Sequence, residues 1–453
     1  MHTQSRWSAV VVVVLVTCCA ALSVAQEHGS PLSLTRAIET ALSTSPLLQA
    51  AQHQVEAATA EIAQARAAFL PKVQAHESLT WADNPVFAFS SKLNQGRFGQ
   101  DDFAVRRLNH PPATQNFKTS LALEQPLYTG GKATLGLKQA ELHRQASTYS
   151  LTRQQQDVIF QVVKAYYGVL RAQADLEVLR AALQAAEANR SLAQVRFEAG
   201  LVIESDVLSA DVRLATLREQ EITTTHQLTL ARATLNDVMG LPLETPYEVS
   251  ERLTPRPSRY PLLEGIEILA LANRPDYQQL GLEVQTVEHG IALARAAFLP
   301  TLSATANYEV NNHTPVGEGQ DSWFISLQVQ WNLFNGLADR AKVTAAQANT
   351  ARLKALRARM ASHIQLEVKE VSLALQAAQQ RISVATGAVA HAQESLRLIR
   401  ERYGAGLTTI VDLLAGEAAL TRAQGNLTLA LYEQNIGMAA LEFALGTMSP
   451  ESF

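Results

Sequence analysis

The sequence predicts a mainly α-helical protein, built from two copies of one structural unit, with a small β part suited to a membrane. Three observations carry this prediction: an internal repeat, two long stretches without proline, and short segments in which apolar and polar residues alternate. The chain has 453 residues, of which 47% are hydrophobic and 18% are charged, a composition typical of folded proteins. The formal net charge of −4 argues against a nucleic-acid partner, because nucleic-acid binding usually leaves a basic surface.

The repeat is visible in two pairs of motifs. The heptapeptide Ala-Arg-Ala-Ala-Phe-Leu-Pro occurs at residues 65–71 and again at 294–300, an offset of 229. The motif Arg-x-x-x-Gly-Leu, followed by Asp, occurs at residues 196–206 and 402–412, an offset of 206. The difference of 23 between the offsets means that the first copy carries 23 additional residues between positions 71 and 127. This pattern predicts two related units, at residues 26–240 and 262–446, joined by a proline-containing linker (241–261, with a short strand near 247–249) and followed by a tail (447–453).

The first 25 residues have the three parts of a secretory signal peptide. Arg6 is positive, residues 9–22 form an apolar segment, and Ser-Val-Ala at residues 23–25 is a small-x-small cleavage site. Acylation of Cys18 or Cys19, which would make a lipoprotein, is an alternative that the sequence leaves open. No later segment holds 18 consecutive apolar residues, so we expect any membrane insertion to use strands.

Two stretches without proline, residues 127–241 and 316–449, predict long helices, because proline costs about 3 kcal/mol in a helix interior. Apolar residues recur in them at helical spacing, as at Ile159, Val162 and Tyr166. We expect helices at residues 132–199, 204–239, 338–405 and 409–445, and shorter ones at 46–69 and 275–298. Helices of this length need coiled-coil neighbours, since an ordinary globular core cannot bury them.

Four segments of about 10 residues alternate between apolar and polar side chains, as transmembrane β-strands do. They lie at residues 73–81, 117–127, 302–310 and 323–333, and Glu77 falls on the apolar face of the first, against the expected register. The alternative is a soluble hairpin packed on the helices. We expect the loop at residues 82–116, which holds the additional residues, to face the cell exterior. Aromatic residues are expected to face lipid: Trp81, Phe117, Tyr308, Trp323 and Trp331.

Four strands are too few to close a barrel, because single-chain membrane barrels begin at eight strands. Open strand edges are also unfavourable in lipid. The sequence therefore predicts an oligomer in which several chains pool their strands.

The duplication, the order helix–strand–strand–helix–helix and the Arg-x-x-x-Gly-Leu motif in both halves together resemble the TolC-like outer-membrane efflux protein family, the outer membrane factors. The resemblance covers essentially the whole mature chain. It implies a homotrimer in which a long α-barrel of coiled-coil helices is continuous with a 12-strand outer-membrane β-barrel (four strands per chain). The linker and the termini would form a belt around the middle of the helices.

The resemblance also implies a function. The protein would be a passive channel, the exit duct of a tripartite efflux or type I secretion system, with most of its mass in the periplasm. Its partners would be a periplasmic adaptor protein, an inner-membrane transporter of the RND, ABC or MFS type, and outer-membrane lipid. The sequence does not distinguish drugs, metal ions and proteins as cargo.

The two Arg-x-x-x-Gly-Leu turns would form the periplasmic tip. Glycine commonly ends a helix in the left-handed conformation, so Gly200 and Gly406 are expected to do so here. The resemblance assigns adaptor contact to these turns, which contain Arg196, Gly200, Leu201, Arg402, Gly406 and Leu407.

For the entrance, the resemblance implies a latch of Asp206 with Tyr403 and an acidic ring of Asp412. Both aspartates have a simpler explanation, because carboxylates in the first turn of a helix complement its dipole. Thr408 and Ala415 depart from the family pattern at an arginine gate and a second acidic ring, so Glu204 or Glu417 could replace part of the latch.

We find no catalytic motif, no cofactor motif and no metal-ligand spacing among the 11 histidines. The sequence therefore predicts conduction rather than catalysis. The competing hypothesis is a periplasmic coiled-coil scaffold or adaptor without a pore, which would keep the helices and lack lipid-facing strands.

Overall fold

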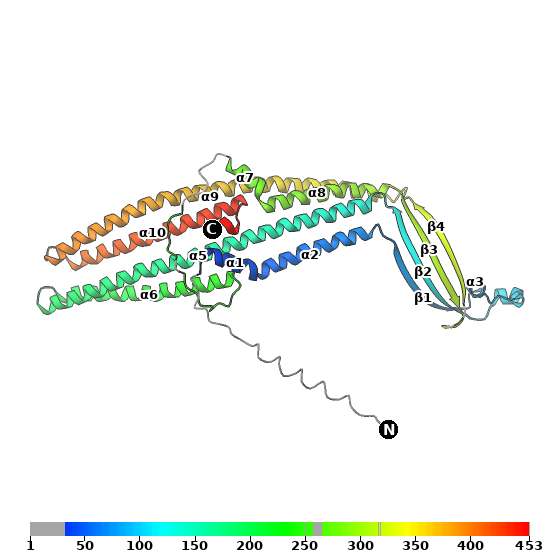
Figure 1. Cartoon of the computed structure of the whole chain (residues 1–453), viewed down its shortest axis with the longest axis horizontal. Coiled ribbons are helices and arrows are strands. Elements are labelled where there is room, and N and C mark those ends of the chain that lie inside the picture. Colours follow the sequence, from blue (N-terminus) through cyan, green and yellow to red (C-terminus); the bar gives the residue numbers. More distant parts are fainter. Residues whose placement is uncertain (1–31, 250, 257–264, 316, 318, 453) are drawn as a thin grey trace, which may run out of the picture.

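The computed structural model describes residues 32–249, 251–256, 265–315, 317 and 319–452. The predicted signal peptide and both cysteines lie outside these residues. The described chain is elongated, with helices along most of its length and a four-stranded sheet at one end (Figure 1).

Each repeat consists of a short helix, a second helix that leads to the sheet, two strands, and a hairpin of two long helices. The first repeat contains α1 (Leu34–Thr44), α2 (Pro46–Ala67), β1 (Lys72–Ala82), β2 (Thr114–Tyr128), α5 (Lys132–Glu198) and α6 (Glu204–Val238). The second contains α7 (Ile266–Asn273), α8 (Pro275–Arg295), η2 (Ala296–Phe298), β3 (Thr301–Asn312), β4 (Gln320–Gln330), α9 (Ala338–Gly404) and α10 (Ile410–Leu445), and η3 (Pro450–Ser452) follows it.

The long helices confirm the predicted duplication. α5 and α9 have 67 residues each, and their ends are related by the same offset of 206 that relates the motifs. The four predicted long helices agree with the structure to within one residue at each end. At 1.5 Å per residue, α5 and α9 are each about 100 Å long.

Short segments pack against the long helices about halfway along the molecule (Figure 1), and we name α1, α7 and residues 241–249 the belt. The sequence did not predict α1 and α7, which pack against α5 and α9. Ile38 of α1 is fully buried together with Val162 and Tyr166 of α5. The predicted strand at residues 247–249 is wrong, because this segment forms no strand. The main chain of Glu248 instead accepts a hydrogen bond from Leu32 N at 2.8 Å.

The four strands form one antiparallel sheet in the order β1-β2-β3-β4. β1 and β2 belong to the first repeat, β3 and β4 to the second, and the β2–β3 pairing joins the repeats at the centre of the sheet. β1 and β4 are left as edge strands, each with an unpaired row of main-chain groups in the protomer.

The register gathers the apolar side chains of all four strands on one face. Directly opposed residues in antiparallel strands share a face, and Leu121 of β2 opposes Tyr308 of β3, which in turn opposes Trp323 of β4. Glu77 lies on this face, and its carboxylate accepts a hydrogen bond from Thr119 Oγ1 at 2.5 Å. The predicted register of β1 is therefore correct, and Glu77 is a polar exception within it.

The predicted lipid-facing aromatic residues lie near both ends of this apolar face. Trp323 is 70% exposed near the start of β4, and Trp331, 59% exposed, follows the last residue of that strand. Their separation of eight residues spans about 26 Å at 3.3 Å per residue, close to the height of the apolar band of membrane barrels. The other three aromatic residues lie toward the Trp323 end of the sheet: Trp81, Phe117 and Tyr308.

The segment that the sequence predicted to be a long loop contains short helices. Residues 83–113, which we name the outer lobe, hold α3 (Pro85–Asn94), η1 (Gln100–Phe103) and α4 (Val105–Asn109). Asn84 begins α3, because its Oδ1 accepts hydrogen bonds from the main-chain N–H groups of Val86 and Phe87 at 3.0 and 3.1 Å. This N-cap, followed by proline, is a helix start signal that the sequence analysis missed.

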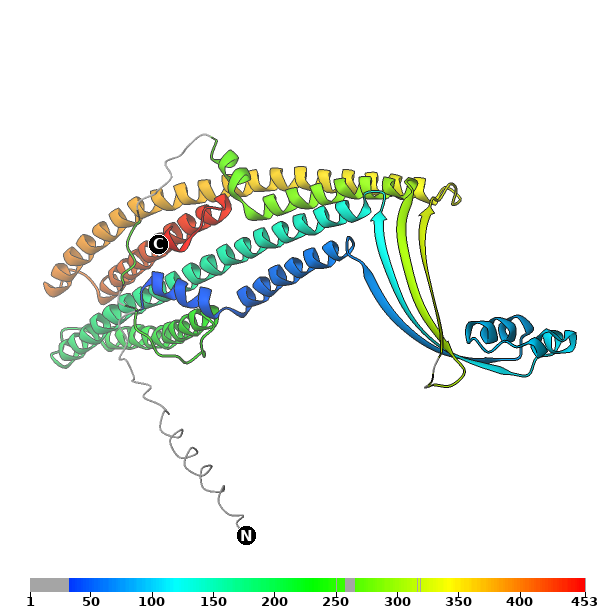
Figure 2. The ribbon, with the colours of Figure 1, turned by 45° about the vertical axis from the view of Figure 1, so that its right-hand side comes forward.

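The outer lobe lies beyond the end of the sheet that is farthest from the helices (Figure 2). Its rings pack edge to face, since Phe98 lies 4.7 Å from Phe89 and 5.1 Å from Phe103 between centroids. Gln95 attaches the lobe to the polar face of the sheet by donating to Asn116 Oδ1 at 2.8 Å. The additional residues of the first repeat therefore form a defined structure.

Candidate gate at the hairpin tips

The two helical hairpins, α5–α6 and α9–α10, turn at the end of the molecule opposite to the sheet (Figure 1). The turns comprise residues 199–203 and 405–409, so each contains the Gly-Leu end of its Arg-x-x-x-Gly-Leu motif. We name these two turns, with the first helical turn after each, the tip.

The motif has a local structural explanation. Gly200 and Gly406 have φ angles of 71° and 70°, which confirms the predicted left-handed helix ends. Leu201 N donates to Arg196 O at 2.8 Å, and Leu407 N donates to Arg402 O at 2.8 Å. These are the hydrogen bonds of a Schellman motif, which satisfies carbonyl groups at a helix end. Both leucine side chains are exposed, Leu201 at 73% and Leu407 at 68%.

The helices that follow the turns begin differently. α10 begins with a capping box, in which Thr409 Oγ1 accepts from Asp412 N at 3.3 Å and the Asp412 carboxylate accepts from Thr409 N at 3.2 Å. α6 begins at Glu204 with no side-chain cap, and its first turn carries Glu204 and Asp206. Glu204 is exposed and Asp206 is partly exposed.

Asp412 is exposed and is held in place by its neighbours. Its Oδ2 accepts hydrogen bonds from Thr408 Oγ1 at 2.6 Å and from Thr409 Oγ1 at 2.8 Å. The hydrogen bond from Thr408, followed by those from Thr409, lowers the pKa of Asp412 below its ordinary value. Thr408, the departure from the family pattern, thus supports the aspartate and favours its ionised form.

Arg196 connects the two tip turns. Its Nη1 donates to Tyr403 O at 3.0 Å, its Nη2 donates to Gly404 O at 3.2 Å, and its Cζ lies 4.6 Å from the centre of the Tyr403 ring. An arginine of the first repeat therefore caps the end of α9 in the second. Carbonyl groups at a helix C-terminus lack intrahelical partners and favour a cation.

The predicted hydrogen bond between Asp206 and Tyr403 is absent from the described part of the chain. The Tyr403 side chain is buried, and its hydroxyl oxygen has no hydrogen-bond partner there. The physical reason is that the Tyr403 ring packs beneath Arg196 in an apolar cluster with Leu396 and Ile410.

Glu417 makes a second connection between the hairpins. Its Oε1 accepts from Asn189 Nδ2 of α5 at 2.7 Å and from Arg400 Nη2 of α9 at 3.1 Å. The Glu417 side chain is only 7% exposed. Glu417 is the residue that the sequence offers as a possible substitute in the latch, but no sequence pattern indicates Asn189 or Arg400, because such contacts depend on how the helices pack.

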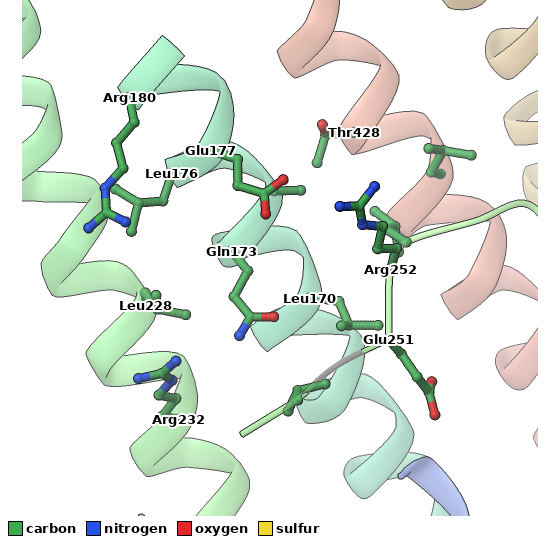
Figure 3. A pocket seen from close by; sticks show the side chains of 14 residues that line it. Leu170, Gln173, Leu176, Glu177, Arg180, Leu228, Arg232, Glu251, Arg252 and Thr428 are labelled. Atoms are coloured by element: carbon green, nitrogen blue, oxygen red, sulfur yellow. The ribbon is translucent and has the colours of Figure 1, made fainter. Parts of the chain in front are cut away.

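One surface groove lies far from the tip, at the level of the belt. It has a volume of about 540 Å³ and lies among α5, α6, α10, Val249 and residues 251–253. Figure 3 shows leucines along it, with the charged side chains of Glu177, Arg180 and Arg232 at its edges. None of the predicted gate residues lines this groove.

Within the described ranges, no group of three or more His, Cys, Asp and Glu side chains could hold a metal ion. None of the helices in the part of the chain that the structure describes is both long and apolar enough to cross a membrane.

Comparison with known proteins gives consistent matches along the chain. The profile of the outer membrane efflux protein family matches residues 37–241 and 268–447. The chain is 25% identical to the alkaline protease secretion protein AprF of Pseudomonas aeruginosa over 443 residues, covering 93% of this chain and 86% of AprF. It is 26% identical to the outer membrane protein TolC of Vibrio cholerae over 421 residues, covering 90% of this chain and 89% of TolC.

The crystal structure of the outer membrane protein VceC from Vibrio cholerae has the same fold. Its TM-score is 0.77 at 21% identity, with 91% of this chain and 96% of VceC covered. The segments matched by the family profile include both repeats and both tip turns. This chain therefore belongs to the outer membrane efflux protein family, the TolC-like exit ducts of the outer membrane.

Proposed function

We propose that three copies of this chain form one passive channel that conducts cargo without catalysing a reaction. The observation that carries the proposal is the sheet, which has one continuous apolar face and two unpaired edges. In a trimer, β1 of each protomer would pair with β4 of the next. Every strand would then have two neighbours, as the hydrocarbon region of a membrane requires.

The same feature argues against a scaffold or adaptor without a pore. In the described protomer all eleven residues of β4 are exposed, among them Trp323, Ile325 and Leu327. A soluble hairpin would pack these side chains against the helices. An apolar face that no helix covers suits contact with lipid.

For partners, we propose a periplasmic adaptor at the tip and an inner-membrane transporter that supplies the energy. The exposed Leu201 and Leu407 side chains offer the adaptor two apolar contacts per protomer. The transporter would be of the RND, ABC or MFS type. Because AprF is named for protease secretion and matches 93% of this chain, a protein is the first cargo to test.

At the entrance, we propose that three copies of Asp412 form an acidic ring, with Glu204 and Asp206 from the other turn adding negative charge. Asp412 is suited to this role because its side chain is exposed while Oδ2 alone accepts the hydrogen bonds of the capping box. Tyr403 and Arg196 would hold the two turns of one chain together beside the ring.

Asp412→Asn is expected to lower the cation selectivity of the channel, measured as the reversal potential in a KCl gradient across a planar bilayer. Asp412→Glu should retain the selectivity, because it keeps the charge while disturbing the cap. The hydrogen bonds from Thr408 and Thr409 lower the pKa of Asp412, which opposes the rise in pKa that neighbouring carboxylates of the ring would cause. Unchanged selectivity in Asp412→Asn would contradict the ring.

The proposal as a whole is tested with the purified protein in detergent and in bilayers. We expect a trimer by light scattering, and discrete conductance steps after reconstitution into a planar bilayer. A monomer in mild detergent, or a trimer without any conductance, would overturn the channel. Export is then tested in cells that lack their own duct, by measuring secreted protease and drug resistance separately.

A further inference from the structure

The internal repeat predicts a second contact like the one made by Arg196, and a single chain does not form it. The offset of 206 relates Arg196 to Arg402, Phe197 to Tyr403 and Glu198 to Gly404. Within the chain, Arg196 of the first repeat reaches across to Tyr403 and Gly404 of the second. The equivalent contact would run from Arg402 of the second repeat to Phe197 and Glu198 of a first repeat.

Neither half of this second contact has a side-chain hydrogen-bond partner within the described residues, although the Phe197 carbonyl oxygen accepts a main-chain hydrogen bond from Gly200 N at 2.9 Å. The Arg402 side chain is exposed and makes no hydrogen bond or ion pair within the described residues, and its charge helps to lower the pKa of Asp412 on the following turn. Phe197 is 39% exposed, whereas its counterpart Tyr403 is 5% exposed. No side chain in the described ranges donates to the carbonyl oxygens of Phe197 or Glu198, which end α5.

We propose that Arg402 of each protomer binds Phe197 and Glu198 of the partner subunit, and that this contact holds the closed tip together between chains. The guanidinium would lie over the ring of the partner subunit's Phe197 and donate to the two terminal carbonyl oxygens of its α5. The partner is thus a second copy of this chain. The inference rests on the proposed trimer.

The residues around the two contacts differ, and this difference explains why the contact between chains would break when the tip opens. We call the surroundings of each contact a joint. In the joint within a chain, Leu396 and Ile410 are buried at 2% and 0% exposure around Tyr403. The corresponding positions of the first repeat, offset by 206, hold Arg190 and Glu204. With charged residues at these two positions, the contact surface between chains has a smaller apolar core, so its strength depends more on contacts such as that of Arg402.

When the tip opens, Arg402 would leave the partner subunit's Phe197. Three such contacts, related by the trimer axis, would open together.

Cross-linking tests first whether Arg402 lies close to the partner subunit's Phe197. In a background with Cys18 and Cys19 replaced by serine, Arg402→Cys and Phe197→Cys are combined and treated with a short bis-maleimide. We expect covalent dimers and trimers on denaturing gels. The control combines Phe197→Cys with Arg397→Cys, since Arg397 is also exposed on α9 but pairs with Glu394 and Glu401 of its own helix. A trimer without cross-links in the test pair would overturn the inference and leave the trimer standing.

The role of Arg402 in keeping the tip closed is tested by measuring conductance in planar bilayers without the adaptor. Arg402→Ala removes all three contacts of the trimer and should raise the open probability at least about fivefold, because each exposed cation–π contact alone is worth about two- to fivefold. Arg397→Ala should leave it unchanged. Phe197→Ala added to Arg402→Ala should add little, because both changes remove the same contact. Equal open probability in wild type and Arg402→Ala would overturn the inference, whereas absence of any conductance in wild type would overturn the proposed channel.

Discussion

Replacing Gly446 with alanine is expected to destabilise the protein by about 2–4 kcal/mol, the sum of backbone strain and a steric clash. Gly446 ends α10 with a φ angle of 71°, a conformation that costs alanine energy. A Cβ atom at this position would also lie 2.7 Å from Arg274 Cα and 2.8 Å from Arg274 N. Main-chain atoms cannot move aside as a flexible side chain can. The midpoint of thermal unfolding, followed by circular dichroism in detergent, measures the effect.

Two other glycines provide matched controls for Gly446→Ala. Gly406 ends α9 with a φ of 70°, but a Cβ there would meet no atom within 4 Å, so Gly406→Ala should cost only the strain. Gly240 is the counterpart of Gly446 in the first repeat, and a Cβ there would approach the Thr44 hydroxyl at 3.1 Å. The expected order of destabilisation is Gly446, Gly240, Gly406. Equal midpoints for all three variants would contradict the clash at Arg274.

Removing the Arg274 side chain is expected to have the second large effect on stability. Arg274 binds Asp276 through Nη2 to Oδ2 at 2.7 Å and through Nε to Oδ1 at 3.1 Å. Its Nη1 donates to Glu367 Oε2 of α9 at 2.5 Å. Breaking a buried ion pair costs about 3–5 kcal/mol, and the partial exposure of the two carboxylates (23% and 27%) reduces our expectation to about 2–4 kcal/mol.

The pH dependence of Arg274→Ala provides an internal check. Burial alone would raise the pKa of Asp276, but the hydrogen bond from Arg274 and the charges of Arg153 and Arg274 outweigh it and lower the pKa. A lowered pKa stabilises the fold above the ordinary aspartate pKa of about 3.9, and the stabilisation is lost as pH falls further. The difference in stability between wild type and Arg274→Ala should therefore shrink below about pH 4. A difference that grows in acid would contradict the ion pair.

Gly446 and Arg274 lie at one contact site, where the end of α10 meets α5 and the α7–α8 corner. The two repeats differ at this site. Gln156 of α5 donates to Gly446 O at 2.8 Å, and Arg153 of α5 donates to Phe443 O at 3.0 Å while lying 3.7 Å from the Phe443 ring. The end of α10 is thereby held between α5 and the α7–α8 corner. In the first repeat, Ser45 stands at the position of Arg274, so the corresponding site has no ion pair.

Much of the fold could be predicted because short stretches of sequence determine where its helices and strands begin and end. Proline marks where helices cannot continue, glycine marks where Schellman motifs end them, and alternation marks strands with two different faces. Since each signal depends on neighbouring residues only, the two copies could be compared position by position. The short helices escaped prediction for the opposite reason: α1 and α7 are only 11 and 8 residues long. At that length, packing against α5 and α9 stabilises them more than their own sequence does.

The sequence by itself determined that the protein is duplicated, how long its helices are, which face of each strand is apolar, and which glycines turn the chain at the tip. Only the tertiary structure decided which side chains meet. It placed Arg196 of one repeat on Tyr403 of the other, left the predicted bond from Asp206 unmade, and joined Glu417 to Asn189 and Arg400. The reason is geometric: a contact between residues some 200 positions apart depends on the rotation and height of two packed helices, which no local pattern records.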